Sequence, residues 1–136
     1  MKVSDLMTTR IVSVESTSTV KDAALLMNHN NIGAVPVVDA GAVKGMLTDR
    51  DIVLRCVAEN RDAASIKVSD ICSNGAVTIK PSQNVADALN IMSTEQIRRL
   101  PVVDNGHIVG MLSLADVARE KKGMEIAQAI SDISMP

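Results

Sequence analysis

The sequence of 136 residues contains no phenylalanine, tyrosine or tryptophan. Proteins that bind single-stranded nucleic acid usually stack bases on aromatic side chains, and cages for quaternary ammonium groups are built from them. Both kinds of site are therefore excluded. A flat ligand must be held between aliphatic side chains, and the eight methionines must fill the core together with valine, isoleucine and leucine.

Several other features are scarce. Two cysteines give no disulfide framework, and neither histidine stands at metal-ligand spacing from a cysteine, so we expect no metal site. The formal net charge of −2 provides no basic field for nucleic acid or an anionic membrane. No apolar run could span a bilayer, and the N-terminus does not look like a secretory signal. The sequence therefore predicts a cytoplasmic protein with neither nucleic acid nor membrane as a partner.

A repeat is the most informative feature that is present. Val3-Ser4-Asp5 recurs as Val68-Ser69-Asp70, 65 residues later. The same shift aligns Pro36-Val37-Val38-Asp39 with Pro101-Val102-Val103-Asp104 without a gap. A matched repeat of this size indicates two copies of one supersecondary unit that bury their apolar faces against each other. Such a pair offers two equivalent clefts.

Each copy is predicted to run strand, helix, hairpin, helix, as judged from its hydrophobic periodicity. The short strands are residues 12–14 and 77–79, and the first helices start at Val20 and Val85. The helix that starts at Asp49 or Arg50 is expected to turn four apolar side chains inward: Ile52, Val53, Cys56 and Val57. After a break at Gly123, the tail carries an apolar stripe, Ile126, Ile130 and Ile133, that either packs on the module or contacts a second subunit.

The best chemical motif is Gly45-x-x-Thr48-x-x-Asp51, repeated as Gly110-x-x-Ser113-x-x-Asp116. In one interpretation it is a capping box that stabilises a helix by about 1 kcal/mol and needs no ligand. In the other, the helix N-terminus attracts phosphate, and the acid and hydroxyl bind ribose hydroxyls, as an acid does in dinucleotide-binding folds. The residues alone leave both interpretations open. No serine–histidine–aspartate or cysteine–histidine pattern is found, so we expect no enzyme activity.

With these motifs, the copies resemble the cystathionine β-synthase (CBS) domain, and the chain resembles a stand-alone CBS-domain pair. The resemblance implies an α/β fold of two β-α-β-β-α repeats with pseudo-twofold symmetry. Repeat 1 would be residues 3–58, the linker 59–65, repeat 2 residues 66–122 and a helical tail 123–136. It also implies a homodimer and an adenosyl ligand, such as AMP, ADP, ATP, S-adenosylmethionine or NAD, in clefts between the repeats. No obligatory cofactor is expected.

The resemblance also assigns binding residues. Thr48, Asp51, Ser113 and Asp116 match the family's ribose and phosphate contacts. The base is expected near the first strand of the partner repeat, at Thr9, Arg10 and Ile11 for one cleft and at Asn74 and Ala76 for the other.

The two clefts are not expected to be equal. Arg98 and Arg99 precede the second hairpin, and two guanidinium groups suit phosphate oxygens. Their counterparts are Gly33 and Ala34, and repeat 1 adds Asp49, partly offset by Arg50. Each arginine alone could instead be a solvated or interface residue. We therefore predict a regulatory module that senses an adenine nucleotide and signals through dimer shape or to an unknown effector protein. The alternative is a structural or stress-related homodimer without a physiological nucleotide.

Overall fold

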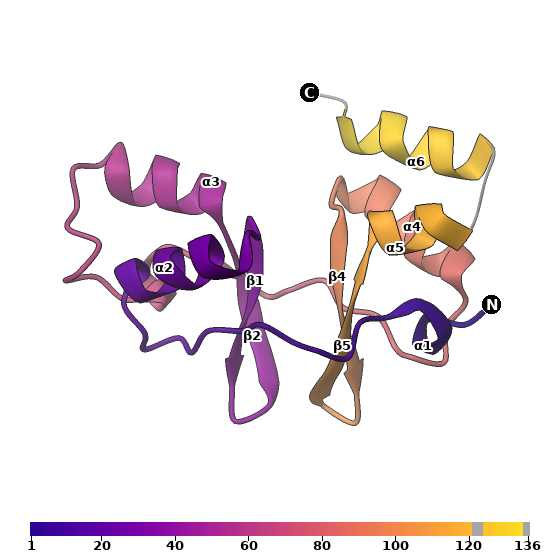
Figure 1. Cartoon of the computed structure of the whole chain (residues 1–136), viewed down its shortest axis with the longest axis horizontal. Helices are drawn as coiled ribbons and strands as arrows, with labels where there is room; N and C mark the ends of the chain where they lie inside the picture. Colours follow the sequence, from indigo (N-terminus) through magenta and orange to yellow (C-terminus); the bar gives the residue numbers. More distant parts are fainter. Residues whose placement is uncertain (121–123, 135–136) are drawn as a thin grey trace. The chain divides into compact units, whose positions relative to one another are not determined.

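The computed structural model describes residues 1–120 and 124–134 of the chain (Figure 1). The chain divides into two compact units: unit 1 combines Met1–Ile11 with Val77–Pro136, and unit 2 is Val12–Ala76. The compact units are therefore offset from the sequence repeats, because the first segment of each copy packs in the unit of the other copy. The predicted start of the tail at Gly123 lies outside the described residues.

Unit 2 is built on a three-stranded antiparallel sheet in the order β1-β2-β3. The strands β1 and β2 form the hairpin that the sequence predicts, and the short β3 pairs with the far side of β2. Its elements are α2 (Val20–Asn30), β1 (Ala34–Asp39), β2 (Ala42–Thr48), α3 (Asp49–Ile52), the π-helical turn η1 (Val53–Val57), the 3₁₀ turn η2 (Val68–Asp70) and β3 (Ser73–Asn74).

Unit 1 repeats this plan around the hairpin β4–β5. Its elements are α1 (Val3–Leu6), α4 (Val85–Glu95), β4 (Arg99–Asp104), β5 (His107–Ser113), α5 (Leu114–Glu120) and α6 (Met124–Ser134). The N-terminal segment, indigo in Figure 1, lies beside β5, where Thr8 and Met111 exchange backbone hydrogen bonds of 2.8 and 2.9 Å. Thr8 thus takes the place beside β5 that Ser73 takes beside β2.

The predicted strands at residues 12–14 and 77–79 are wrong in extent. Each is reduced to one parallel bridge, Val14 with Val37 and Ile79 with Val102. Val14 donates its N–H to the Pro36 carbonyl, and its own carbonyl accepts the Val38 N–H. Since Pro36 has no N–H to donate, the ladder cannot continue along this edge.

The cores follow the predicted helical stripes. Thr19 caps α2 by accepting the Asp22 N–H at 3.1 Å, and the helix buries Val20, Ala23 and Met27 against the hairpin. The helix α4 buries the matching stripe Val85, Ala88, Leu89 and Met92. Among the described residues, no helix has the length and apolarity that crossing a membrane requires.

The inward face predicted after β2 is only half right. Cys56 is buried and Ile52 half-buried, but Val53 and Val57 are 55% and 67% exposed. For Val57 the cause is the π-helical turn, in which the Ala58 N–H bonds to the Val53 carbonyl. Such a turn holds one residue more than an α-helical turn, so the side chains toward its end no longer keep the α-helical register.

Candidate functional site

The repeated motif forms a capping box in both units. The Thr48 hydroxyl accepts the Asp51 N–H at 3.0 Å, and Asp51 Oδ2 accepts the Thr48 N–H at 2.9 Å. Ser113 and Asp116 make the same pair of bonds at 3.0 Å each. The capping interpretation is therefore confirmed as local geometry. It leaves the second carboxylate oxygen of each aspartate for another partner, so it does not exclude ligand binding.

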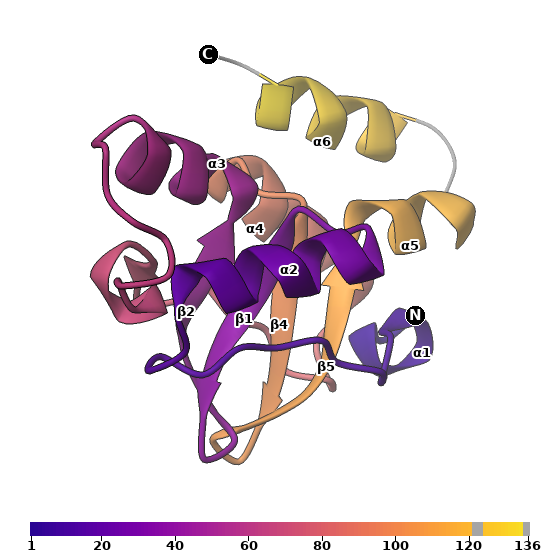
Figure 2. The same ribbon diagram turned by 60° about the vertical axis from the view of Figure 1, so that its left-hand side comes forward.

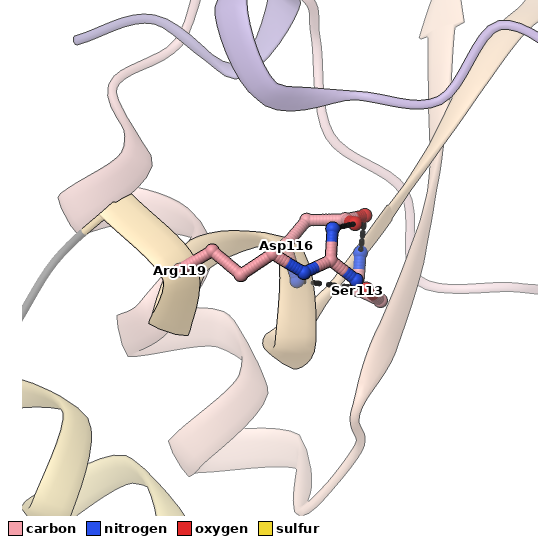
Figure 3. A network of polar contacts seen from close by, with 3 residues as sticks. All are labelled: Ser113, Asp116 and Arg119. Atoms are coloured by element: carbon pink, nitrogen blue, oxygen red, sulfur yellow. Dashed lines mark hydrogen bonds and ion pairs between the residues drawn. The ribbon is translucent and has the colours of Figure 1, made fainter.

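In unit 1 that second oxygen is paired. Arg119 Nη1 lies 3.1 Å from Asp116 Oδ1, and Figure 3 shows the guanidinium beside the capping box. Because the Arg119 side chain is 72% exposed, this ion pair is weak and exchangeable. The equivalent position in unit 2 is Leu54, which cannot pair with Asp51.

A cavity of about 480 Å³ opens beside the capping box of unit 1. It brings together three predicted site residues, Arg98, Arg99 and Ser113. The rest of its lining comes from two helices, with Leu114, Ala115 and Ala118 on α5 and Ile130, Ile133 and Ser134 on α6. The arginines stand at the start of β4, and Ser113 ends the neighbouring β5, since Arg99 lies opposite Ser113 in the ladder. The hairpin therefore holds the cationic and hydroxyl groups side by side.

The predicted base-binding residues of this site share the unit but not the cavity. Thr9, Arg10 and Ile11 follow the bridge between Thr8 and Met111 and belong to unit 1. They are not among the residues that line the cavity. The cavity thus extends from Ser113 of the motif toward α6.

The matching place in unit 2 carries the opposite charge. The Asp49 N–H bonds to the Gly33 carbonyl at 2.9 Å, as the Leu114 N–H bonds to the Arg98 carbonyl at 2.8 Å. A Cβ atom on Gly33 would lie 2.9 Å from Asp49 Oδ2, so the carboxylate rests directly on this glycine. The pair Arg98 and Leu114 of unit 1 thus corresponds to Gly33 and Asp49 in unit 2.

The remaining predicted residues lie in unit 2. Asn74 pairs with Gly45 in the β2–β3 ladder, and Ala76 belongs to the same unit. Arg50 is exposed on α3.

The surroundings of Cys72 in unit 2 favour its uncharged thiol. Burial raises the pKa of the Cys72 thiol, and the negative charge of Asp51 raises it further. Cys72 is therefore a packing residue in its thiol form rather than a reactive thiolate. In the described part of the chain, no three His, Cys, Asp or Glu residues gather as a metal site.

Sequence reasoning missed the contribution of α6. Its stripe was interpreted as a closing helix or a subunit contact, and α6 does pack against α4 with Ala129 in the core. What the spacing did not reveal is that Ile130, Ile133 and Ser134 line the cavity. Arg119, the partner of Asp116, was also missed, although its i,i+3 spacing from the acid is a usable signal.

Known proteins match this chain over nearly its whole length. The family model described as CBS domain matches residues 3–57 and again 68–123. The CBS domain-containing protein YhcV of Bacillus subtilis is 44% identical over 133 residues, covering 97% of this chain and 94% of the relative. Hypoxic response protein 1 of Mycobacterium tuberculosis is 31% identical over 133 residues, covering 97% and 93%.

Solved structures agree in fold. A crystal structure of Hypoxic Response Protein I with two coordinated zinc ions has a TM-score of 0.83 at 30% identity, covering 90% of this chain and 100% of that one. The CBS domain pair of protein MJ0100, in complex with 5′-methylthioadenosine and S-adenosyl-L-methionine, has a TM-score of 0.77 at 26% identity, covering 88% and 94%.

Proposed function

This chain belongs to the CBS-domain family, and from that premise we propose that it is a regulatory module that binds an adenine nucleotide in the cavity of unit 1. Tandem CBS proteins are regulatory, and the matching family is not a catalytic one. The observation that carries the proposal is the meeting of Arg98, Arg99 and Ser113 in one open cavity. Two guanidinium groups and a hydroxyl suit a phosphate bonded to a ribose.

The choice of an adenosine ligand is supported by a relative. The MJ0100 domain pair binds two adenosyl compounds, and this chain shares its fold over most of its length. Asp116 stands next to Ser113 and would accept hydrogen bonds from the ribose hydroxyls in exchange for its weak pair with Arg119. Thr9, Arg10 and Ile11 remain the proposed base contacts.

We rank the site of unit 1 above that of unit 2 for phosphorylated ligands. Unit 1 presents Arg98 and Arg99 to the cavity, whereas Asp49 rests on Gly33 at the equivalent place in unit 2. Charge-assisted hydrogen bonds contribute about 1.5–3 kcal/mol each when partly shielded. The difference is large enough for one site to dominate, and Thr48, Asp51 and Arg50 then form the weaker site.

We further propose a cytoplasmic homodimer that passes ligand occupancy to an effector protein. Unit 2 leaves four large apolar side chains exposed on α2 and on η1, which continues α3: Leu25, Val53, Leu54 and Val57. The helices α2 and α3 contact each other, and an exposed apolar face of this kind marks a contact surface. The same surface would serve the alternative function, a structural or stress-related homodimer without a nucleotide.

A ligand panel distinguishes the two functions. We expect AMP to raise the melting temperature in a dye-based assay and a pyrimidine nucleotide to raise it less; the dye is needed because the chain has no tryptophan or tyrosine. Calorimetric titration should show AMP binding weakened about tenfold or more in Arg99→Ala and largely retained in Asp51→Asn. Adenosine has no phosphate, so its affinity should differ little between the two variants. No shift with any adenosyl compound at millimolar concentration would support the structural alternative. Loss of AMP binding in Asp51→Asn but not in Arg99→Ala would reverse the ranking.

A further inference from the structure

The cavity of unit 1 has two chemically different sides. Arg98, Arg99 and Ser113 form the polar side, and the other side comes from α5 and α6, whose lining residues are apolar except for Ser134. Among the described residues that line it, the two arginines are the only cations. The positive charge of the cavity wall is therefore confined to its polar side.

Helix α6 supplies the part of the wall that has no counterpart in unit 2. Figures 1 and 2 both place it, in yellow, over the pair α4 and α5. Ala129 anchors it in the core, and Gln96 Nε2 donates to the Asp132 carbonyl at 3.1 Å. Ile130 nevertheless stays 48% exposed, since its side chain borders the open cavity. The sequence of the helix, residues 124–134, contains no lysine or arginine that could offset the charge of Asp132.

The positive charge of the cavity wall matches the negative charge of a single phosphate group. A phosphate monoester carries about −1.5 to −2 charges at neutral pH, and Arg98 with Arg99 supplies two positive charges. A second or third phosphate that extended along the wall formed by α5 and α6 would lie against Leu114, Ala118 or Ile130, and contact with apolar side chains removes water from a charge at a cost in free energy. Helix α6 offers such a phosphate no cation in return.

We propose that α6 makes the site of unit 1 selective for adenosine monophosphate over the di- and triphosphate, with Ile130 as a specificity-determining residue. This inference rests on the proposed function of the same cavity. It assigns the C-terminal helix a direct role in choosing the ligand, beyond its packing against α4.

The test replaces the apolar wall by a cation at one position. Ile130→Lys places an ammonium group at the cavity, and Ala127→Lys adds the same charge at an exposed residue of α6 that does not line it. AMP, ADP and ATP are titrated calorimetrically into the full chain and both variants, without Mg²⁺ and at equal ionic strength. A circular dichroism melt shows that each variant is folded, which we expect because both positions are exposed.

The wild-type chain should bind AMP at least about tenfold more tightly than ATP. Ile130→Lys should strengthen ATP binding about tenfold relative to AMP, the size of one charge-assisted contact. Ala127→Lys should change the ratio less than about twofold, as expected for a screened surface charge. Equal wild-type affinities for AMP and ATP, an unchanged ratio in Ile130→Lys, or equal effects of the two lysines would each overturn the inference and leave the proposed function standing. If the wild-type chain binds none of the three, the proposed function falls, and the inference falls with it.

Discussion

Replacing Gly45 by alanine tests how β3, which comes from the second copy, is held on the β1–β2 hairpin of the first. A Cβ atom at this position would overlap the carbonyl oxygen of Ser73, which is backbone and cannot turn away. The strand β3 would have to withdraw from β2. The withdrawal puts three contacts at risk: the ladder itself, the bond from Ser73 Oγ to the Met46 carbonyl at 3.1 Å, and the bond from the Gly75 N–H to the Lys44 carbonyl at 3.2 Å.

The expected cost follows from these contacts. Net hydrogen bonds contribute about 0.5–1.5 kcal/mol each, and overpacking alone costs about 1–3 kcal/mol. Alanine recovers about 0.4–1 kcal/mol by restricting the unfolded chain. We expect Gly45→Ala to lower the free energy of unfolding by about 2–4 kcal/mol, which moves a urea midpoint by about 1–2 M at ordinary m-values.

Gly110→Ala is the matched control. Its Cβ atom would lie 2.8 Å from Met7 Sδ and 3.0 Å from the Thr8 carbonyl oxygen. A methionine side chain adapts easily, so we expect a loss of only about 1 kcal/mol. Urea unfolding followed by far-ultraviolet circular dichroism measures both variants. A Gly45→Ala midpoint equal to that of the wild type, or lower stability in Gly110→Ala than in Gly45→Ala, would refute the reasoning.

Three further predictions concern single side chains. Asp116→Asn keeps an oxygen for the Ser113 N–H but loses the carboxylate charge. Calorimetry should show AMP binding weakened by about 1–3 kcal/mol, while the free energy of unfolding changes by about 0.5 kcal/mol. A sharp loss of stability with unchanged affinity would mean that the residue is only a helix cap. The pKa of Cys72 is raised above its usual 9.0, so the unfolded chain loses this proton first and stability should fall as the pH rises above about 9. Cys72→Ala should lose less stability between pH 8 and 10.5, and equal losses would contradict the assignment. Val57→Glu changes a side chain that is 67% exposed on the proposed dimer surface, so sedimentation should show a folded monomer, whereas we expect a dimer for the wild type; an unchanged sedimentation coefficient would remove this face from the interface.

The sequence predicted most of what depends on local pattern. The shift of 65 residues located equivalent elements in both copies, and the spacing Thr48-x-x-Asp51 predicted the capping box that the structure contains. The helical stripes of α2 and α4 are buried as their period requires. These features need only neighbours within one or two turns, so they can be inferred from spacing.

Features that depend on distant partners were not predicted. Nothing in the spacing shows that Thr8 pairs with Met111, because that bridge joins segments about a hundred residues apart. The π-helical turn at 53–57 was also missed, since apolar residues there fit an α-helical face equally well. The cavity wall at Ile130 depends on how α6 crosses its neighbours, which an amphipathic stripe does not specify.

The first segment of each copy packs in the unit of the other copy, and this arrangement makes each copy depend on the other. The stretch of sequence that repeats and the stretch of chain that completes a sheet are different pieces, because Ser73 and Asn74 of the second copy complete the sheet of the first. A gene fragment that encodes one copy alone therefore specifies a protein with an unfilled edge beside β2 or β5. Such a chain can complete its sheet only with its own first segment or with that of another molecule. We therefore expect the two copies to be retained or lost together.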